Sequence, residues 1–194
     1  AEAWRNAAGR PSTRGPGGPS LRVKEVYSRE QILAYAVGNP SEGFGEKYRP
    51  FDAERRLARH PGPPYLFVDR VTSVEPEPWV LKPGGWVECE YDVPPDAWYF
   101  SADRQGVMPF AVLLEAALQP CGWLAAYLGS ALTSDEDLHF RNLDGVCTAF
   151  EEIGPGSGPL TMRARLTKTS QAGGMILQKF DLEILAAGRR VYAG

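Results

Sequence analysis

Residues 108–132, MPFAVLLEAALQPCGWLAAYLGSAL, decide the fold of this chain because they form a long and almost uninterrupted apolar run. A helix of this composition is apolar on every side, so we expect it to lie inside the protein, enclosed by other elements. Glu115 is the exception, since it is the one formally charged residue between Arg104 and Asp135. A buried carboxylate is costly unless it has a partner or a purpose, and Glu115 is therefore the first candidate for a functional residue.

The same run is long enough to cross a membrane, but that interpretation is the weaker one. Glu115, Gln119 and Pro120 all fall near its centre, and an acid is costly at the centre of a bilayer. The sequence favours a helix buried in a globular domain.

The composition is that of an ordinary globular protein, with 194 residues, 43% hydrophobic and 23% charged. A net charge of −3 gives no reason to expect nucleic acid. Cys89, Cys121 and Cys147 form no CxxC pair, so neither a disulfide framework nor a zinc site is indicated, and a reducing cytoplasm fits best. No glycine-rich phosphate loop appears, and we expect neither a nucleotide nor a metal.

Strand patterns lie on both sides of the apolar run. Residues 65–75, YLFVDRVTSVE, are β-branched and aromatic, and Val87, Cys89 and Tyr91 alternate with acidic residues. After the run come the strand-like segments GVCTAFEEI, GPLTMRARLTKTSQAGG, MILQKFDLEILAAG and RRVYAG. This order predicts an α+β fold in which an antiparallel sheet wraps around one long central apolar helix.

Three parts are predicted along the chain. Residues 1–20 are rich in Gly, Pro, Ser and Arg, which is typical of a flexible linker. Residues 21–60 should hold a helix that begins after Ser28 with a capping box, followed by an extended segment. Residues 61–194 form the sheet-and-helix domain. The missing initiator Met and the end at Gly194 inside a predicted strand suggest a piece of a longer protein.

Several motifs resemble one known family. FGEKYRPFDAERRLARHPGPPYLFVDRV, DAWYF, VMPFAVLLEAALQPCGWLAAYLGSAL and LHFRNLDG resemble the dehydratase regions of polyunsaturated fatty acid synthases and related iterative polyketide synthases. More distantly, they resemble the bacterial β-hydroxydecanoyl-thioester dehydratase. The likeness runs from about residue 39 to the end. It implies a hot-dog fold, no bound cofactor, and removal of water from a 3-hydroxyacyl chain carried on the phosphopantetheine of an acyl carrier protein.

The resemblance also implies the site. In that family a histidine removes the α proton, and a carboxylic acid on the central helix of the neighbouring hot dog protonates the leaving hydroxyl. Glu115, six residues after Pro109, stands at the position of this acid, and burial is expected to raise its pKa so that it can donate a proton. The alternative is a structural Glu115 that bonds a core neighbour. The resemblance places the substrate tunnel and the oxyanion region at Met108, Pro109, Phe110, Ala111 and Gln119.

The histidine of the family is missing from its motif. It stands in HFxGDPVMPG, where this chain has WYFSADRQGVMPF. Alignment on WYF puts Asp103 in its place, and alignment on MP puts Ser101 there. An Asp with an ordinary pKa near ~4 is a weak base, so we expect Asp103 to be inert. The two histidines of the chain, His60 and His139, lie outside the motif, and His139 is the better replacement candidate of the two.

Three interpretations stay open. In the first, the chain supplies Glu115 and half of an acyl tunnel, and a second hot dog, in a homodimer or a double hot dog, supplies the histidine. In the second, the chain is a pseudo-dehydratase that serves as a structural or acyl-binding half. In the third, it is a hot-dog thioesterase in which Glu115 or Asp103 activates water, although QPCGWLAAY favours the dehydratase branch.

The partners implied by the resemblance are a second hot-dog domain and an acyl carrier protein, with no nucleic acid and no membrane. Arg55, Arg56 and Arg59 form a basic patch that could meet an acidic carrier protein. A solvated charged face is the commoner meaning of such a patch.

Overall fold

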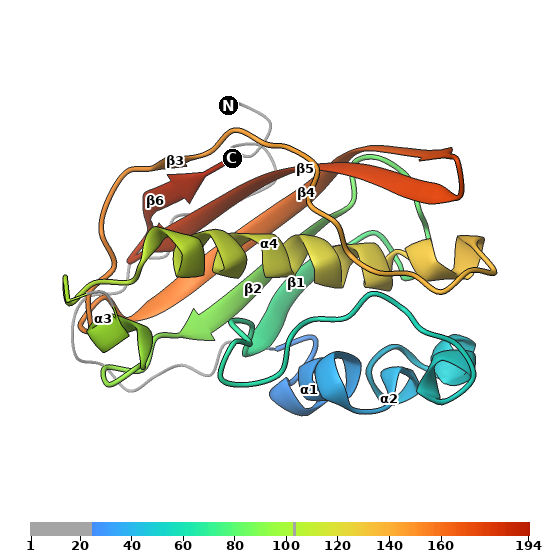
Figure 1. Cartoon of the computed structure of the whole chain (residues 1–194), viewed down its shortest axis with the longest axis horizontal. Helices are drawn as coiled ribbons and strands as arrows, with labels where there is room; N and C mark the ends of the chain where they lie inside the picture. Colours follow the sequence, from blue (N-terminus) through green and yellow to red (C-terminus); the bar gives the residue numbers. More distant parts are fainter. Residues whose placement is uncertain (1–24, 103) are drawn as a thin grey trace.

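The computed structural model describes residues 25–102 and 104–194, so the predicted linker at 1–20 lies outside the described residues. One antiparallel sheet curls around helix α4 (Phe110–Tyr127), with the strand order β1-β2-β4-β5-β6-β3 (Figure 1). The predicted sheet around one apolar helix is confirmed. The strands are β1 (Arg70–Glu75), β2 (Trp86–Asp92), β3 (Thr148–Ala149), β4 (Pro159–Ala172), β5 (Met175–Ala186) and β6 (Arg189–Ala193).

The two faces of the sheet differ in the way that the alternation predicts. Val87, Cys89 and Tyr91 of β2 are buried on the face toward the core. Between them, Glu88 points to the other face, where its Oε2 pairs with Arg163 Nε of β4 at 2.8 Å. One face of the sheet therefore supplies the core, and the other carries charges that are paired across strands.

Helix α4 is buried over most of its second half, whereas its first half is buried on one side only. Within it, Ala116, Trp123 and Leu124 are 0–1% exposed, whereas Phe110 is 52% exposed. The prediction of a helix enclosed on every side is thus wrong at its start, because the sheet covers only one side there. The residues of the first half that are exposed or only partly buried follow a helical spacing and are called the open stripe below: Phe110, Ala111, Leu114, Glu115 and Leu118.

The helix is shorter than the apolar run. It ends because Gly129 adopts the left-handed conformation, with φ of 82°, before the 3-10 turn η2 (Ser130–Thr133). By length and composition α4 could cross a membrane, but 67% of it is buried inside the domain, as in a core helix.

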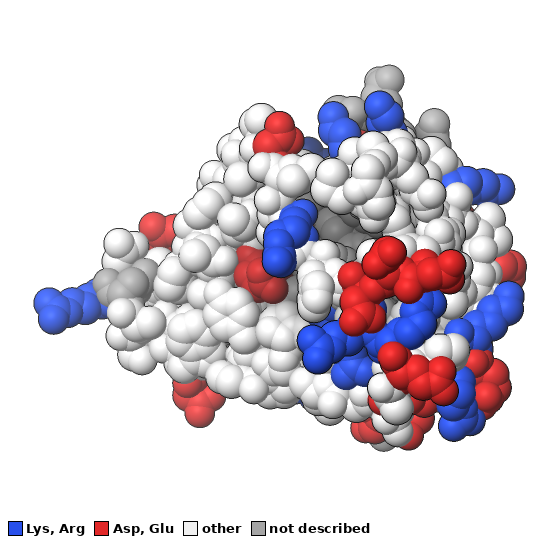
Figure 2. All heavy atoms as spheres, turned by 45° about the vertical axis from the view of Figure 1, so that its right-hand side comes forward, with Lys and Arg blue, Asp and Glu red and all other residues white. Residues whose placement is uncertain are grey.

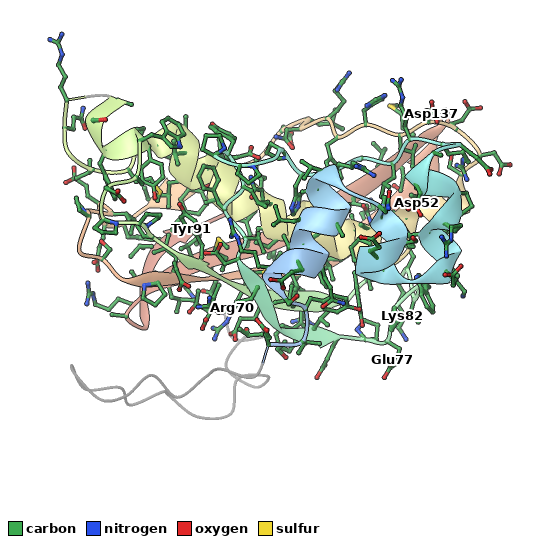
Figure 3. The ribbon with its side chains drawn as sticks, turned by 90° about the horizontal axis from the view of Figure 1, so that it is seen from below. Asp52, Arg70, Glu77, Lys82, Tyr91 and Asp137 are labelled. Atoms are coloured by element: carbon green, nitrogen blue, oxygen red, sulfur yellow. The ribbon has the colours of Figure 1, made fainter. Side chains whose placement is uncertain are left out.

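A layer of short helices packs on the side of α4 that the sheet leaves free (Figures 1 and 3). It comprises α1 (Arg29–Val37), α2 (Pro40–Phe44) and η1 (Glu46–Asp52). The predicted start of α1 is confirmed, since the Ser28 N–H donates to Gln31 Oε1 at 3.0 Å. The segment after α1 is more helical than predicted. We call α1, α2 and η1 the N-terminal layer.

The predicted strand at 145–153 is reduced to the two residues of β3. β3 pairs with β6 on one side, and no strand of the described residues lies on its other side. Residues 139–152, the free edge of the sheet, are all exposed, including Leu143 at 75%, Val146 at 89% and Phe150 at 55%. A segment that has a neighbouring strand on one side only, and whose side chains are all exposed, has little to hold it in a regular strand.

Candidate functional site

Glu115 lies on the second turn of α4, in the open stripe. It is partly buried, so the predicted full enclosure does not occur in this chain alone. Its Oε1 accepts a hydrogen bond from Gln119 Nε2 at 3.0 Å. The sequence therefore placed Glu115 correctly on the central helix, but the described residues do not supply the part of its environment that would complete its burial.

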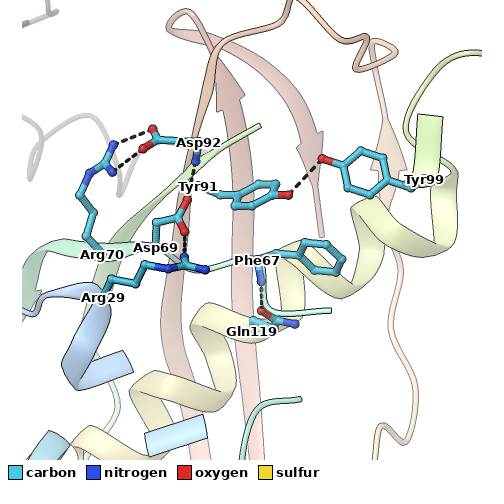
Figure 4. Close-up of polar contacts among 8 residues, drawn as sticks. All are labelled: Arg29, Phe67, Asp69, Arg70, Tyr91, Asp92, Tyr99 and Gln119. Atoms are coloured by element: carbon cyan, nitrogen blue, oxygen red, sulfur yellow. Dashed lines mark hydrogen bonds and ion pairs between the residues drawn. The ribbon is translucent and has the colours of Figure 1, made fainter. Parts of the chain in front are cut away.

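The side-chain amide of Gln119 forms a polar clamp between α4 and the segment before β1, because its oxygen and its nitrogen are both hydrogen-bonded. Its Oε1 accepts from the Phe67 N–H at 2.7 Å (Figure 4). Its Nε2 donates to the Tyr65 carbonyl at 2.8 Å and to Glu115 at 3.0 Å. A backbone N–H can only donate and a carbonyl can only accept, so the two ends of the amide cannot be exchanged. Gln119 consequently always presents an N–H to Glu115.

The clamp explains why the first strand is shorter than predicted. The pattern predicts a strand over 65–75, but β1 begins at Arg70. The backbone groups of Tyr65 and Phe67 bond the side chain of Gln119 instead of a neighbouring strand. The prediction was wrong at this end because the pattern cannot show that a side chain from a distant helix takes these bonds.

The N-terminal end of α4 offers backbone donors that have no carbonyl partner within the helix. The N–H groups of Val112 and Leu113 bond the Pro109 carbonyl at 2.9 and 3.0 Å, and these are the first bonds of the helix. The N–H groups of Phe110 and Ala111 precede them and have no carbonyl partner within the helix. Both residues are exposed, and Ala111 lies about 6 Å before Glu115 along the helix axis. An oxygen with developing negative charge could bind here.

Met108 anchors this end of the helix and is itself buried. Its N–H donates to the Ile153 carbonyl at 2.7 Å, which ties the start of α4 to the strand connection beyond the free edge. Phe110 lies beside Tyr192 of β6, with ring centroids 6.3 Å apart. The open stripe and the free edge therefore adjoin each other.

His60 is buried against α4, not placed in a cleft. It is 5% exposed, and its Nε2 lies 2.7 Å from the Gln119 carbonyl oxygen. Because a carbonyl only accepts, Nε2 carries the hydrogen, and Nδ1 is buried without a partner among the described residues. Burial lowers the pKa of His60 to about 4, although the bond to Gln119 acts in the opposite direction.

His139, the predicted replacement base, is exposed and lies at the other end of α4. It lines a hollow of about 250 Å³ together with Ala125 and Asp137, at the end of the molecule where Figure 3 labels Asp137. Ala125 is about 15 Å from Glu115 along the helix axis. The structure therefore brings neither histidine to the carboxyl group of Glu115.

The loop that replaces the histidine motif is mostly packing. Asp103 lies outside the described residues, and Ser101 is exposed in the short helix α3 (Tyr99–Ala102), where its hydroxyl donates to the Trp98 carbonyl at 3.0 Å. The hydroxyl groups of Tyr99 and Tyr91 lie 3.1 Å apart in the core (Figure 4). The Trp-Tyr-Phe run thus packs this loop onto the sheet.

The predicted basic patch serves the fold. Arg55 donates to the carbonyl groups of Ser134 and Glu136, and Arg59 donates to the carbonyl of Gly38 at 2.8 Å. Figure 2 shows that basic and acidic side chains lie side by side on one part of the surface that it draws. Part of the patch is therefore committed to holding backbone segments together.

The sequence predicts Gln119 to be a tunnel residue, and it places His60 outside the histidine motif of the family. One signal for the clamp was present, because Gln119 lies four residues after Glu115 on an otherwise apolar helix, and side chains at this spacing meet. Nothing local indicated His60, whose partner is a backbone carbonyl far along the chain.

The chain is similar to known proteins in both sequence and fold. The model of the FabA-like domain matches residues 60–194. A polyunsaturated fatty acid synthase subunit of Thraustochytrium sp. (strain ATCC 26185 / S-3) is 29% identical over 167 residues, which are 85% of this chain and 11% of that protein. The dehydratase heterocomplex ApeI:P from Xenorhabdus doucetiae aligns with a TM-score of 0.45 and 14% identity, over 69% of this chain and 81% of that one.

Proposed function

Because this chain belongs to the FabA-like domain family and has its hot-dog fold, we propose that it is one half of a 3-hydroxyacyl-thioester dehydratase. Glu115 gives a proton to the leaving hydroxyl group. A histidine of a second hot-dog domain takes the α proton. The carbon–oxygen bond breaks, the hydroxyl leaves as water, and the electron pair of the broken C–H bond forms the double bond of the enoyl thioester.

The observation that carries this proposal is the bonding of Glu115. Gln119 holds one carboxyl oxygen by an N–H that cannot be exchanged for an acceptor, which leaves the other oxygen to carry the proton. After transfer, the same N–H stabilises the carboxylate that remains. The N–H groups of Phe110 and Ala111, which have no carbonyl partner within the helix, lie about 6 to 8 Å from Glu115 along the axis, where they can polarise the thioester carbonyl.

A second hot dog is part of the proposal because the described residues bring no base to Glu115. The open stripe and the free edge adjoin where Phe110 meets Tyr192, which pairs with Ala149 of β3, and both carry exposed apolar side chains. Apolar groups of this extent on a protein surface are typical of an interface. A partner on this surface would also complete the burial of Glu115, which is partly buried in this chain. The large exposed side chains of this surface are Phe110, Leu143, Val146 and Phe150.

The substrate class follows from the family and from the relative. The Thraustochytrium protein belongs to a polyunsaturated fatty acid synthase, and this chain spans about a tenth of its length. We therefore infer a 3-hydroxyacyl chain carried on the phosphopantetheine of an acyl carrier protein, with no further cofactor. A catalytically inactive acyl-binding half is the alternative, and the lack of a base near Glu115 among the described residues is the observation that favours it.

The test uses this chain together with the hot-dog domain that it pairs with in its natural protein. Formation of the enoyl thioester from a 3-hydroxyacyl thioester is followed by ultraviolet absorbance. Glu115→Gln should lower kcat by about 100-fold or more, because it removes the general acid. Glu54→Gln, at an exposed carboxylate, is the matched control and should keep the rate. Full activity of Glu115→Gln would refute the acid role, and a wild-type pair that binds the substrate without converting it would establish the alternative.

A further inference from the structure

The turn of α4 that carries Glu115 and Gln119 has a gap in its hydrogen bonds. Pro120 lies inside the helix and has no N–H, so the bond that would join residue 120 to the Ala116 carbonyl is missing. A helix weakened in this way depends on outside contacts for its local geometry. The position of the acid is therefore sensitive to what holds this turn from the other side.

The N-terminal layer and the segment after it supply such contacts. Three side chains from outside the sheet bond carbonyl oxygens along one side of α4. Two of the donors are tyrosine hydroxyl groups and one is an imidazole. The pairs are His60 Nε2 with Gln119 at 2.7 Å, Tyr35 with Gly122 at 3.4 Å, and Tyr48 with Ala126.

We propose that His60 is a positioning residue of the dehydratase site, because its Nε2–H holds the main chain of the residue whose side chain holds Glu115. The proposal rests on the proposed function of Glu115. Gln119 is gripped at two places: its carbonyl oxygen by His60, and its amide by Tyr65 and Phe67. Because both its main chain and its amide are held, the side-chain N–H of Gln119 points at Glu115 in one fixed orientation.

The space around His60 is shaped for the ring. The imidazole meets the Tyr35 ring edge-on, with centroids 5.0 Å apart. Gly122 makes room on the other side, because a Cβ there would lie 3.2 Å from His60 Nε2 and 3.1 Å from the ring of Phe140. The ring is therefore held on two sides, and its donor points at the carbonyl of Gln119.

Stability alone does not account for an imidazole at this place. Its Nδ1 is a buried acceptor without a partner among the described residues, and leaving such a group unpaired destabilises a fold. An apolar side chain of similar size would avoid that loss. What the imidazole supplies and an apolar side chain cannot is the hydrogen bond to Gln119.

The test compares three variants of the paired protein. His60→Leu removes the donor, His60→Gln keeps an N–H at about the same reach, and Tyr48→Phe removes a bond to the same helix about three turns beyond Glu115. We expect His60→Leu to lower kcat about tenfold with KM unchanged, since a small misplacement of a reacting group slows the chemical step. His60→Gln should recover most of the rate, and Tyr48→Phe should keep it. The inference is wrong if His60→Leu keeps the wild-type kcat, or if Tyr48→Phe loses as much.

A second measurement does not depend on activity. Hydrogen exchange of the Gln119 side-chain amide, followed by NMR on this chain, should become faster in His60→Leu and stay unchanged in Tyr48→Phe. Unchanged exchange in His60→Leu would overturn the inference by itself. If Glu115→Gln is inactive and His60→Leu is fully active, only this inference fails, whereas full activity of Glu115→Gln refutes the proposed function and leaves the exchange result to decide on His60.

Discussion

Acid should destabilise this fold through His60, in a pH range set by its burial. The folded state holds the pKa of His60 at about 4, whereas the unfolded chain has an ordinary value of about 6.5. Between these two values the unfolded chain binds a proton that the folded protein does not. The free energy of unfolding is therefore complete above pH 6.5 and falls as the pH drops toward 4.

The size of the effect follows from the difference between the two pKa values. Each unit of difference corresponds to about 1.4 kcal/mol, so the loss approaches about 3 kcal/mol over the whole range and reaches about 2.5 kcal/mol by pH 4.5. Since His60 is only 5% exposed, solvent does little to screen it. The protonated ring would also meet the Gln119 carbonyl without a partner for its Nδ1–H.

The assay is urea unfolding of the wild type and of His60→Gln at pH 7.5 and pH 4.5. Acidic residues titrate in both proteins, so the difference between the two pH dependences isolates His60. The wild type should lose about 2.5 kcal/mol more than the variant. Tyr48→Phe, a buried change at a group that does not titrate in this range, should follow the wild type. Parallel curves for the wild type and His60→Gln would refute the reasoning.

Three further predictions concern the clamp, the helix packing and the interface. Gln119→Leu should lower the free energy of unfolding by about 2–4 kcal/mol in urea, because it leaves the N–H and the carbonyl that it bonds unpaired in the core. Gly122→Ala should cost about 1–3 kcal/mol in the same assay through overpacking, whereas Gly156→Ala, where a Cβ meets nothing within 4 Å, should cost little. The double change Leu143→Ser and Val146→Ser should alter the free energy of unfolding by no more than about 0.5 kcal/mol, because both side chains are exposed. It should nevertheless weaken pairing with the second hot dog, as measured by analytical ultracentrifugation. Unaltered pairing would exclude the free edge from the interface.

The sequence by itself determined the central helix, the sheet around it and the position of Glu115 on the helix. Period-2 alternation in β2 and a long apolar run in α4 are local properties, so the sheet around one helix could be predicted from them. Glu115 stood out because a single charge in an apolar run is visible without any structure.

Only the tertiary structure decided what surrounds Glu115. The Gln119 clamp joins α4 to Tyr65 and Phe67, and the bond from His60 reaches the same residue from outside the sheet. Both contacts join residues more than 50 positions apart, and neither leaves a periodic trace in the chain. The open stripe was missed for the same reason: an apolar residue looks the same in a sequence whether it faces its own core or a surface meant for another domain, and only packing separates the two.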